Sequence, residues 1–334
     1  MYFGFTDEEV AFRDAVRDLL IDACPPAAVR AAWEGGPGYD AKLWSRLGEM
    51  GVLGILAPED SGGLGLTELS LVLLLEETGK AALPGPIVEH AAVAVPLLAA
   101  AGRTDLVERA AAGEALVTFA ERPERVGWAQ EADVALVASG AGVHLVRAAD
   151  RVGADPLACV DRSRRDASLR WEGGEEIVAD TSLAADRAAL GAAAQLCGLA
   201  RHLIDVTVGY TTQRHQFGVP IGSYQALKHH LAGALLQLEL ARPAVYRAAW
   251  SIAHAEPTRS RDLSMAKVMA NEAGALAARV ALQCHGAIGY TWEYDLHLWM
   301  KRVWVLERAW GDSAYHRARV ADAVLGPARG SGAG

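Results

Sequence analysis

The C-terminal half of the chain holds three long segments in which apolar residues recur at helical spacing, and this pattern constrains the fold most strongly. The segments cover about 184–213, 223–255 and 261–285. A further helix is expected over about 307–325. Long helices joined by short loops favour an antiparallel bundle, so the sequence predicts a C-terminal antiparallel four-helix bundle over 184–326.

Two other patterns precede this bundle. Residues 1–115 indicate an N-terminal helical domain, which begins with a capping box between Thr6 and Glu9. Residues 116–183 hold short β-branched or alternating runs that are separated by Gly, Asp and Pro, as is typical of strands. The runs are Leu116–Ala120, Val134–Ala138, Val143–Val146, Leu157–Val160 and Leu169–Trp171. We therefore predict a mainly α fold with a small middle β domain, and a flexible tail over 327–334.

Composition excludes several classes of function. The chain has 334 residues with 41 acidic and 32 basic side chains, a formal net charge of −9, which argues against a nucleic-acid partner. No apolar stretch approaches the ~18 residues of a transmembrane helix, and the N-terminus lacks the basic region of a secretory signal. The four cysteines form no CxxC pair, which argues against a disulfide framework or a metal site and favours a cytoplasmic location.

The first candidate site is the segment from Arg214 to Gln225, Arg-His-Gln-Phe-Gly-Val-Pro-Ile-Gly-Ser-Tyr-Gln. An arginine at a helix end, followed by a Gly-bounded turn and a new helix, suits an anion such as a phosphate. A lone arginine at a helix C-terminus is equally a common partner of the helix dipole, so the segment alone leaves both interpretations open.

The second candidate site is the segment from Gln283 to Tyr294, Gln-Cys-His-Gly-Ala-Ile-Gly-Tyr-Thr-Trp-Glu-Tyr. A long helix is expected to end at Gly286, and glycines there allow a ligand to approach the backbone closely. The alternative is an ordinary helix that ends at a glycine.

In this order, separated by a long helix, the two segments resemble motifs of the acyl-CoA dehydrogenase family. The family patterns are Arg-x-x-Phe-Gly-x-x-Ile-x-x-x-Gln and Gln-x-x-Gly-Gly-x-Gly-Tyr. Three N-terminal stretches agree with the family as well: Phe5-Thr6-x-Glu-Glu, Trp44-x-x-Leu-x-x-x-Gly and Pro58-Glu-x-x-Gly-Gly-x-Gly-Leu66. The resemblance covers almost the whole chain, and the expected order of helices, sheet and helical bundle is the family's architecture.

The resemblance implies FAD-dependent α,β-dehydrogenation of an acyl-CoA thioester, in which a carboxylate removes the α-proton. It also implies that the motif residues reach the ADP part of an FAD held mainly by a neighbouring subunit. The matching positions here are Arg214, Phe217, Gln225 and Gln283, with the backbone near Gly286. Family members are usually tetramers.

The sequence departs from the family at the catalytic base. The family's Glu lies in a Tyr-Glu-Gly-Thr turn, and the position that matches this Glu here holds Trp310. An indole cannot accept a proton from carbon, and its bulk would occupy the acyl channel. If the alignment slips, Asp312 is the nearest carboxylate, with Glu307 a turn earlier. Some family members carry the base on the preceding helix, where Asp186 is the nearest candidate here, although a helix N-cap is its more ordinary role.

The middle domain departs from the family too. Only Glu121 and Pro123 match the loop that wraps the flavin in family members, so the loop that would hold a flavin in the same subunit is missing. The pattern resembles the shortened subunit of heterotetrameric members known from sterol side-chain degradation. It implies a longer acyl-CoA dehydrogenase subunit as partner in an α2β2 heterotetramer, FAD at their interface, and an electron-transfer flavoprotein or similar acceptor.

Two alternatives remain open at this point. One is a self-sufficient acyl-CoA dehydrogenase that uses Asp312 or Asp186, and the other is a non-redox acyl-CoA-binding or scaffold subunit. Four tryptophans between 292 and 310 favour a filled pocket or a subunit interface over a ligand platform. The charged run Asp161–Asp166 is expected to be a solvated loop, with a contact to a CoA phosphate as the second interpretation.

Overall fold

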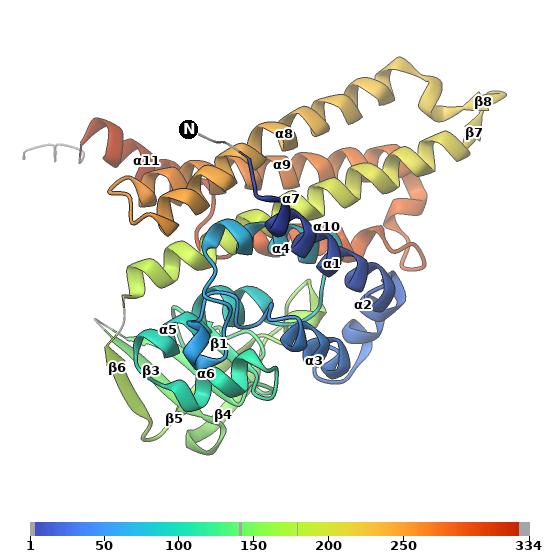
Figure 1. Ribbon diagram of the computed structural model, residues 1–334. Helices are drawn as coiled ribbons and strands as arrows, with labels where there is room; N and C mark the ends of the chain where they lie inside the picture. The colour runs from blue at the N-terminus through green and yellow to red at the C-terminus, as the bar shows by residue number, and fades with distance from the viewer. Residues whose placement is uncertain (1–3, 140–141, 179, 327–334) are drawn as a thin grey trace, which may run out of the picture.

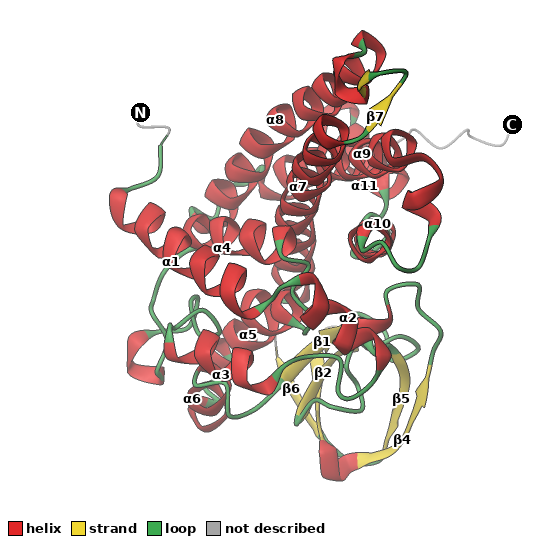
Figure 2. Ribbon diagram, turned by 90° about the vertical axis from the view of Figure 1, so that its right-hand side faces the viewer, coloured by secondary structure: helices red, strands yellow, loops and turns green. Residues whose placement is uncertain are grey.

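The computed structural model describes residues 4–139, 142–178 and 180–326 and confirms a mainly helical fold (Figure 1). Short helices form one end of the molecule, a small β unit lies beside them, and long helices run across the other side (Figures 1 and 2). The expected flexible tail, 327–334, lies outside the described residues. In the described part of the chain, no helix is long and apolar enough to cross a membrane, and no cluster of His, Cys, Asp and Glu could hold a metal ion.

The N-terminal part is helical, as expected. Its capping box forms, because the Thr6 hydroxyl accepts from the Glu9 N–H at 3.2 Å and the Glu9 carboxylate accepts from the Thr6 N–H at 2.9 Å. A π-helical segment precedes α5. The elements are α1 (Asp7–Ala23), α2 (Pro26–Glu34), α3 (Ala41–Glu49), α4 (Glu68–Lys80), the π-helix η2 (Val88–Ala94), α5 (Val95–Ala100) and α6 (Thr104–Ala111).

The middle part contains two small sheets. Their strands are β1 (Val117–Ala120), β2 (Val134–Ser139), β3 (Gly142–Arg147), β4 (Arg151–Pro156), β5 (Ala167–Trp171) and β6 (Glu175–Val178). The larger sheet has the order β1-β2-β3-β6, with β1 parallel to β2, and β4 pairs with β5 in a separate ribbon. The expected strand at Leu157–Val160 is wrong, because the strand ends at Pro156. Charged residues and glycine hide β4 and β6 from a search for apolar alternation.

The C-terminal part is built from long helices, which Figure 1 shows side by side. They are α7 (Thr181–Gln213), α8 (Gln225–Ala253) and α9 (Arg259–His285), followed by the shorter α10 (Leu296–Leu306) and α11 (Ser313–Leu325). The expected helix over 307–325 begins too early, and α10 was not predicted. The chain leaves the helical conformation before α11, because Trp310 and Gly311 have φ values of 60° and 98°.

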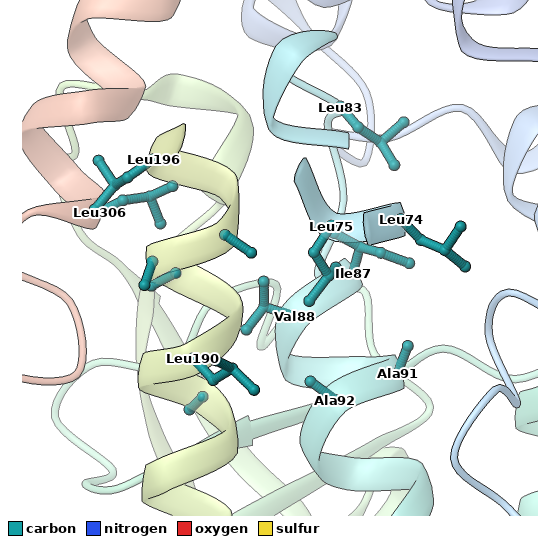
Figure 3. Close-up of a cluster of buried hydrophobic side chains, with 14 of the residues drawn as sticks. Leu74, Leu75, Leu83, Ile87, Val88, Ala91, Ala92, Leu190, Leu196 and Leu306 are labelled. Atoms are coloured by element: carbon teal, nitrogen blue, oxygen red, sulfur yellow. The ribbon is translucent and has the colours of Figure 1, made fainter. Parts of the chain in front are cut away.

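Close contact between α4 and α7 joins the N-terminal helices to the bundle. A Cβ atom at Gly198 would lie 1.9 Å from the Glu76 carbonyl oxygen, and one at Gly79 would lie 2.2 Å from the Gln195 carbonyl oxygen. Only glycine therefore fits at either position. Figure 3 shows the apolar side chains that pack beside this contact, among them Leu75, Val88 and Leu190. The contact fixes the long helices relative to the rest of the molecule.

Candidate functional site

A short β-hairpin with a two-residue turn extends from the far end of the bundle, where the chain passes from α7 to α8 (Figure 1). Strand β7 (His215–Gln216) pairs with β8 (Val219–Pro220), and Phe217 and Gly218 form the turn. Their φ values are 53° and 82°, so both turn residues are left-handed, as a type I′ turn requires. The Phe217 side chain is 93% exposed. An aromatic ring is thus held in solvent by a tight turn, although left-handed backbone is unfavourable for phenylalanine.

Arg214 and Gln225 lie at the base of this hairpin. Arg214 ends α7, and its backbone is fixed because its N–H donates to the Tyr210 carbonyl at 2.9 Å and its carbonyl accepts from the Ile221 N–H at 2.8 Å. The Arg214 side chain is exposed and makes no ion pair within the described ranges. Gln225 is the first residue of α8 and is also exposed. The guanidinium therefore remains available to an anion from outside the chain.

The second segment lies at the same end of the bundle. Helix α9 ends at His285, Gly286 follows with a φ of 63°, and the Gln283 side chain is exposed. The ring of His285 stacks on the ring of Tyr210, which lies in the last turn of α7, with centroids 4.3 Å apart. This stack joins the end of α9 to the end of α7, so the fold brings the two motif segments together.

Sequence reasoning did not single out the three rings that make this junction. His285 donates from Nδ1 to the Ala281 carbonyl at 2.7 Å, so its Nε2 accepts from the Tyr294 hydroxyl at 3.0 Å. Burial lowers the pKa of His285, which agrees with a neutral imidazole. The sequence did contain His285 and Tyr294 within the second motif segment. Their contact with Tyr210 could not be predicted, because Tyr210 lies in another helix.

Trp310, which the sequence motif is expected to align with the family's catalytic carboxylate, lies in the loop before α11. Its indole stacks on the ring of Phe119 in β1, with centroids 5.8 Å apart and planes 23° from parallel. Phe119 is itself buried. An aromatic contact thus joins the β unit to the bundle, and neither ring can accept a proton from carbon.

Two buried side chains hold the segment that carries Trp310. Lys267 of α9 donates to the carbonyl oxygens of Leu306 at 3.0 Å and Gly311 at 3.2 Å. His316 of α11 donates from Nε2 to the Trp310 carbonyl at 2.9 Å. Burial lowers the pKa of Lys267 to about 7 and that of His316 to about 4. Backbone carbonyls at both ends of this segment are therefore tied to buried donors.

The alternative carboxylates have structural partners. Asp312 caps α11 by accepting from the Tyr315 N–H at 2.9 Å, and this hydrogen bond lowers the pKa of the exposed Asp312 carboxyl. Asp186 is 1% exposed and forms ion pairs with Arg259 at 3.3 Å and Arg319 at 3.1 Å. Neither carboxylate is a free base.

One interpretation of Asp186 is therefore wrong. The N-cap of α7 is Asp180, which accepts from the Leu183 N–H at 2.9 Å. Asp186 lies further along the helix, and its ion pairs come from the start of α9 and the middle of α11. Glu307, the remaining carboxylate near Trp310, is half-buried, and burial raises its pKa.

The interpretation of Asp161–Asp166 as a solvated loop is also wrong. Asp161 and Asp166 are buried, and Asp161 pairs with the buried Arg302 of α10. Arg164, in the short helix η4 (Arg162–Arg164), pairs with Glu89 of the π-helix at 3.0 Å. These ion pairs join the β unit to both helical parts. A single sequence cannot show them, because Asp161 and Arg302 are 141 residues apart.

The four clustered tryptophans divide into two pairs. Trp299 is buried and stacks on His202 at 4.0 Å, and Trp310 packs on Phe119. Trp292 and Trp304 are partly exposed. The cluster is therefore not a single filled pocket.

Comparison with known proteins identifies the family. The acyl-CoA dehydrogenase N-terminal domain matches residues 6–113, and the acyl-CoA dehydrogenase C-terminal domain matches residues 174–325. The acyl-CoA dehydrogenase IpdE2 of Mycolicibacterium smegmatis is 36% identical over 298 residues, which cover 89% of this chain and 92% of the relative. The acyl-CoA dehydrogenase FadE34 of Mycobacterium tuberculosis is 32% identical over 323 residues, covering 89% of this chain and 45% of the relative.

The solved structures agree. A chain of the ChsE4-ChsE5 complex from Mycobacterium tuberculosis has a TM-score of 0.89 and 25% identity, covering 98% of this chain and 100% of that chain. The two family domains, the relatives that align over 89% of the chain and the fold all indicate the same family. The chain belongs to the acyl-CoA dehydrogenase family, whose members are oxidoreductases that act on acyl-CoA.

Proposed function

We propose that this chain is the subunit of a heteromeric acyl-CoA dehydrogenase that completes the FAD site of a catalytic partner and has no catalytic base of its own. The observation that carries the proposal is Trp310, which stands at the position of the base and packs against Phe119. The partner is a longer acyl-CoA dehydrogenase subunit, and the assembly is an α2β2 heterotetramer that passes electrons to an electron-transfer flavoprotein or a similar acceptor.

The exposed end of the bundle fits the ADP part of an FAD. Arg214 offers a guanidinium without an internal carboxylate, which suits a phosphate. Phe217 offers an exposed ring, and the amides of Gln225 and Gln283 offer donors and acceptors from two helices. Gly286 leaves its backbone open, since a Cβ atom there would meet no atom within 4 Å. All five residues are exposed, so they suit a cofactor that is held mainly by another subunit.

The roles of the chain's residues follow from this arrangement. Bound FAD would supply the acceptor for the hydride that leaves the β-carbon of the thioester. Arg214 would pair with a phosphate oxygen of the cofactor, and the type I′ turn would hold the Phe217 ring against it. The α-proton would leave to a carboxylate of the partner, because the indole of Trp310 has no basic atom.

The relatives support a two-subunit assembly. The ChsE4-ChsE5 structure is a complex of two named proteins, and its fold matches this chain over nearly the full length. The self-sufficient alternative has less support, because Asp312 and Asp186 are engaged by a helix end and by two arginines. The non-redox scaffold alternative does not explain why Arg214 and Phe217 are exposed at the end of the bundle.

A test compares Arg214→Gln with Arg201→Gln in a complex with the longer partner. Arg214 directly follows α7, whereas Arg201 lies within α7 and pairs with Asp205 at 3.0 Å. We expect Arg214→Gln to lower the FAD content of the assembled complex and its acyl-CoA turnover, and Arg201→Gln to leave both unchanged. An assembled Arg214→Gln complex with full FAD and full turnover would contradict the proposal.

A further inference from the structure

A cavity of about 280 Å³ lies among α1, α2 and α3, which Figure 1 shows at one side of the molecule. The part of its wall that α2 supplies is built from small residues, since Ala28, Ala31 and Ala32 line it. Leu43 and Leu47 of α3 add larger apolar side chains to the lining. Side chains as small as alanine do not fill the space between these helices, so a cavity remains where most protein interiors are close-packed.

The indole of Trp44 also lines this cavity, and it carries an unused hydrogen-bond donor. The Trp44 side chain is 3% exposed, and its Nε1–H donates to no acceptor within the described part of the chain. The partly exposed ring of Tyr39, another lining residue, packs edge-on against Trp44 with centroids 5.9 Å apart. A buried donor without an acceptor costs free energy, and an acceptor brought by a ligand would recover that cost.

The lining offers little to an ionic ligand. Cys24 at the end of α1 is buried, and burial raises the pKa of its thiol to about 12, so the thiol stays protonated. The Asp40 carboxylate is already engaged, because it caps α3 by accepting from the Lys42 N–H at 2.8 Å. The free polar group that remains in the buried part of the wall is the Trp44 N–H.

The β unit holds one edge of the cavity in place. Arg165 donates to the carbonyl oxygens of two lining residues, Ala32 at 2.9 Å and Gly35 at 2.7 Å. The loop that follows is packed just as closely, since a Cβ atom at Gly38 would lie 2.5 Å from the Ser163 carbonyl oxygen. The cavity is therefore formed before any ligand enters, so binding does not have to order this loop.

The size and the lining of the cavity select the kind of ligand. An apolar cavity of about 150 Å³ takes a benzene ring, so a space nearly twice as large suits two fused rings. The unused indole N–H suits a carbonyl oxygen. We propose that the cavity binds a neutral, apolar molecule of about two fused rings whose carbonyl oxygen accepts from the Trp44 N–H. The site includes neither Arg214 nor Trp310, so it does not depend on the proposed function.

The test is equilibrium dialysis of the purified chain against two probes, 1-tetralone and tetralin. They have the same two fused rings, and tetralin lacks the carbonyl oxygen. We expect saturable binding of one 1-tetralone per chain, with a rise in the melting temperature. Trp44→Phe keeps an apolar ring but removes the N–H, so it should weaken the binding of 1-tetralone about tenfold and leave that of tetralin nearly unchanged.

A second pair of variants locates the site without changing Trp44. Ala28→Leu places a larger side chain in the cavity and should abolish the binding of both probes, and thermal melting checks that the variant folds. Ala27→Leu is the matched control, because Ala27 is exposed on the same helix and does not line the cavity. The proposal is overturned if 1-tetralone does not bind the natural chain, which would leave water as the partner of the indole N–H. It is also overturned if Trp44→Phe weakens the two probes equally or not at all, or if Ala28→Leu binds them as well as Ala27→Leu.

Discussion

The indole of Trp310 stacks on the ring of Phe119, with centroids 5.8 Å apart and planes 23° from parallel. The contact links the loop before α11 to the first strand of the β unit. Under the proposed function, it stands where members of the family place the carboxylate that begins dehydrogenation. Two aromatic rings at this point are compatible with packing and incompatible with proton transfer from carbon.

We expect Trp310→Ala to reduce stability without changing the turnover of the complex with its catalytic partner. Removing a partly buried stacked indole should lower the free energy of unfolding by about 2 kcal/mol. The matched control is Trp304→Ala, because Trp304 is partly exposed and lies six residues earlier in the same region. Chemical denaturation measures the first effect and steady-state turnover the second. A complex that loses its turnover with Trp310→Ala while remaining folded would show that the indole takes part in the reaction.

Lys267→Met should destabilise the loop that carries Trp310. The substitution leaves the carbonyls of Leu306 and Gly311 without their buried donor, and the loss should cost about 3 kcal/mol. The near-ultraviolet circular dichroism should weaken as the Trp310 ring loses its fixed position. Lys42→Met is the control, because Lys42 is exposed. Equal unfolding free energies for the two variants would contradict the role given to Lys267.

The folded chain should lose stability in weak acid because of His90. This histidine is fully buried, with Nε2 donating to the Ala110 carbonyl and Nδ1 accepting from the Val117 N–H, and burial lowers its pKa to about 4. The unfolded state binds the proton near pH 6.5, so the free energy of unfolding should fall between pH 6.5 and 4 by about 1.4 kcal/mol per pH unit.

His90→Gln isolates this contribution. A glutamine amide can accept and donate in the same way but does not titrate in this range. Unfolding titrations at several pH values should therefore show a shallower loss of stability for His90→Gln than for the natural chain. Identical pH profiles would show that His90 is not the group responsible.

Asp312→Asn tests the self-sufficient alternative. Asparagine caps a helix about as well as aspartate, so α11 should keep its stability and the complex its turnover. Asp312→Ala removes the cap and should cost about 1 kcal/mol of stability. Turnover that disappears with Asp312→Asn in a folded protein would instead identify this carboxylate as the base.

The sequence was informative where a pattern is local. The helical spacing predicted a start for α9 that is two residues from the observed start, Arg259, and it predicted the observed end, His285. The two motif segments were also found, because each is a short run with defined glycines. The parallel pairing of β1 with β2 could not be predicted from the sequence, because a parallel pair requires a crossover connection that no local pattern reveals.

The missed features depend on residues that are far apart in the chain. Asp161 and Asp166 looked solvated because charged runs usually are, but they pair with Arg302 and Arg125, which lie far from them in the chain. Helix α10 was overlooked because its aromatic and apolar run was assigned to a pocket or an interface. The junction of Tyr210 with His285 likewise required the fold, because it joins two helices whose ends meet in space.

The most direct test of the account is the flavin content of the isolated chain and of its complex with the longer partner. Absorbance of FAD after denaturation, divided by protein concentration, gives the ratio, and acyl-CoA turnover is measured on the same samples. We predict no stoichiometric FAD and no turnover for the isolated chain, and one FAD for each pair of unlike subunits in the active complex. An isolated chain that carries one FAD per subunit and oxidises an acyl-CoA would contradict the account.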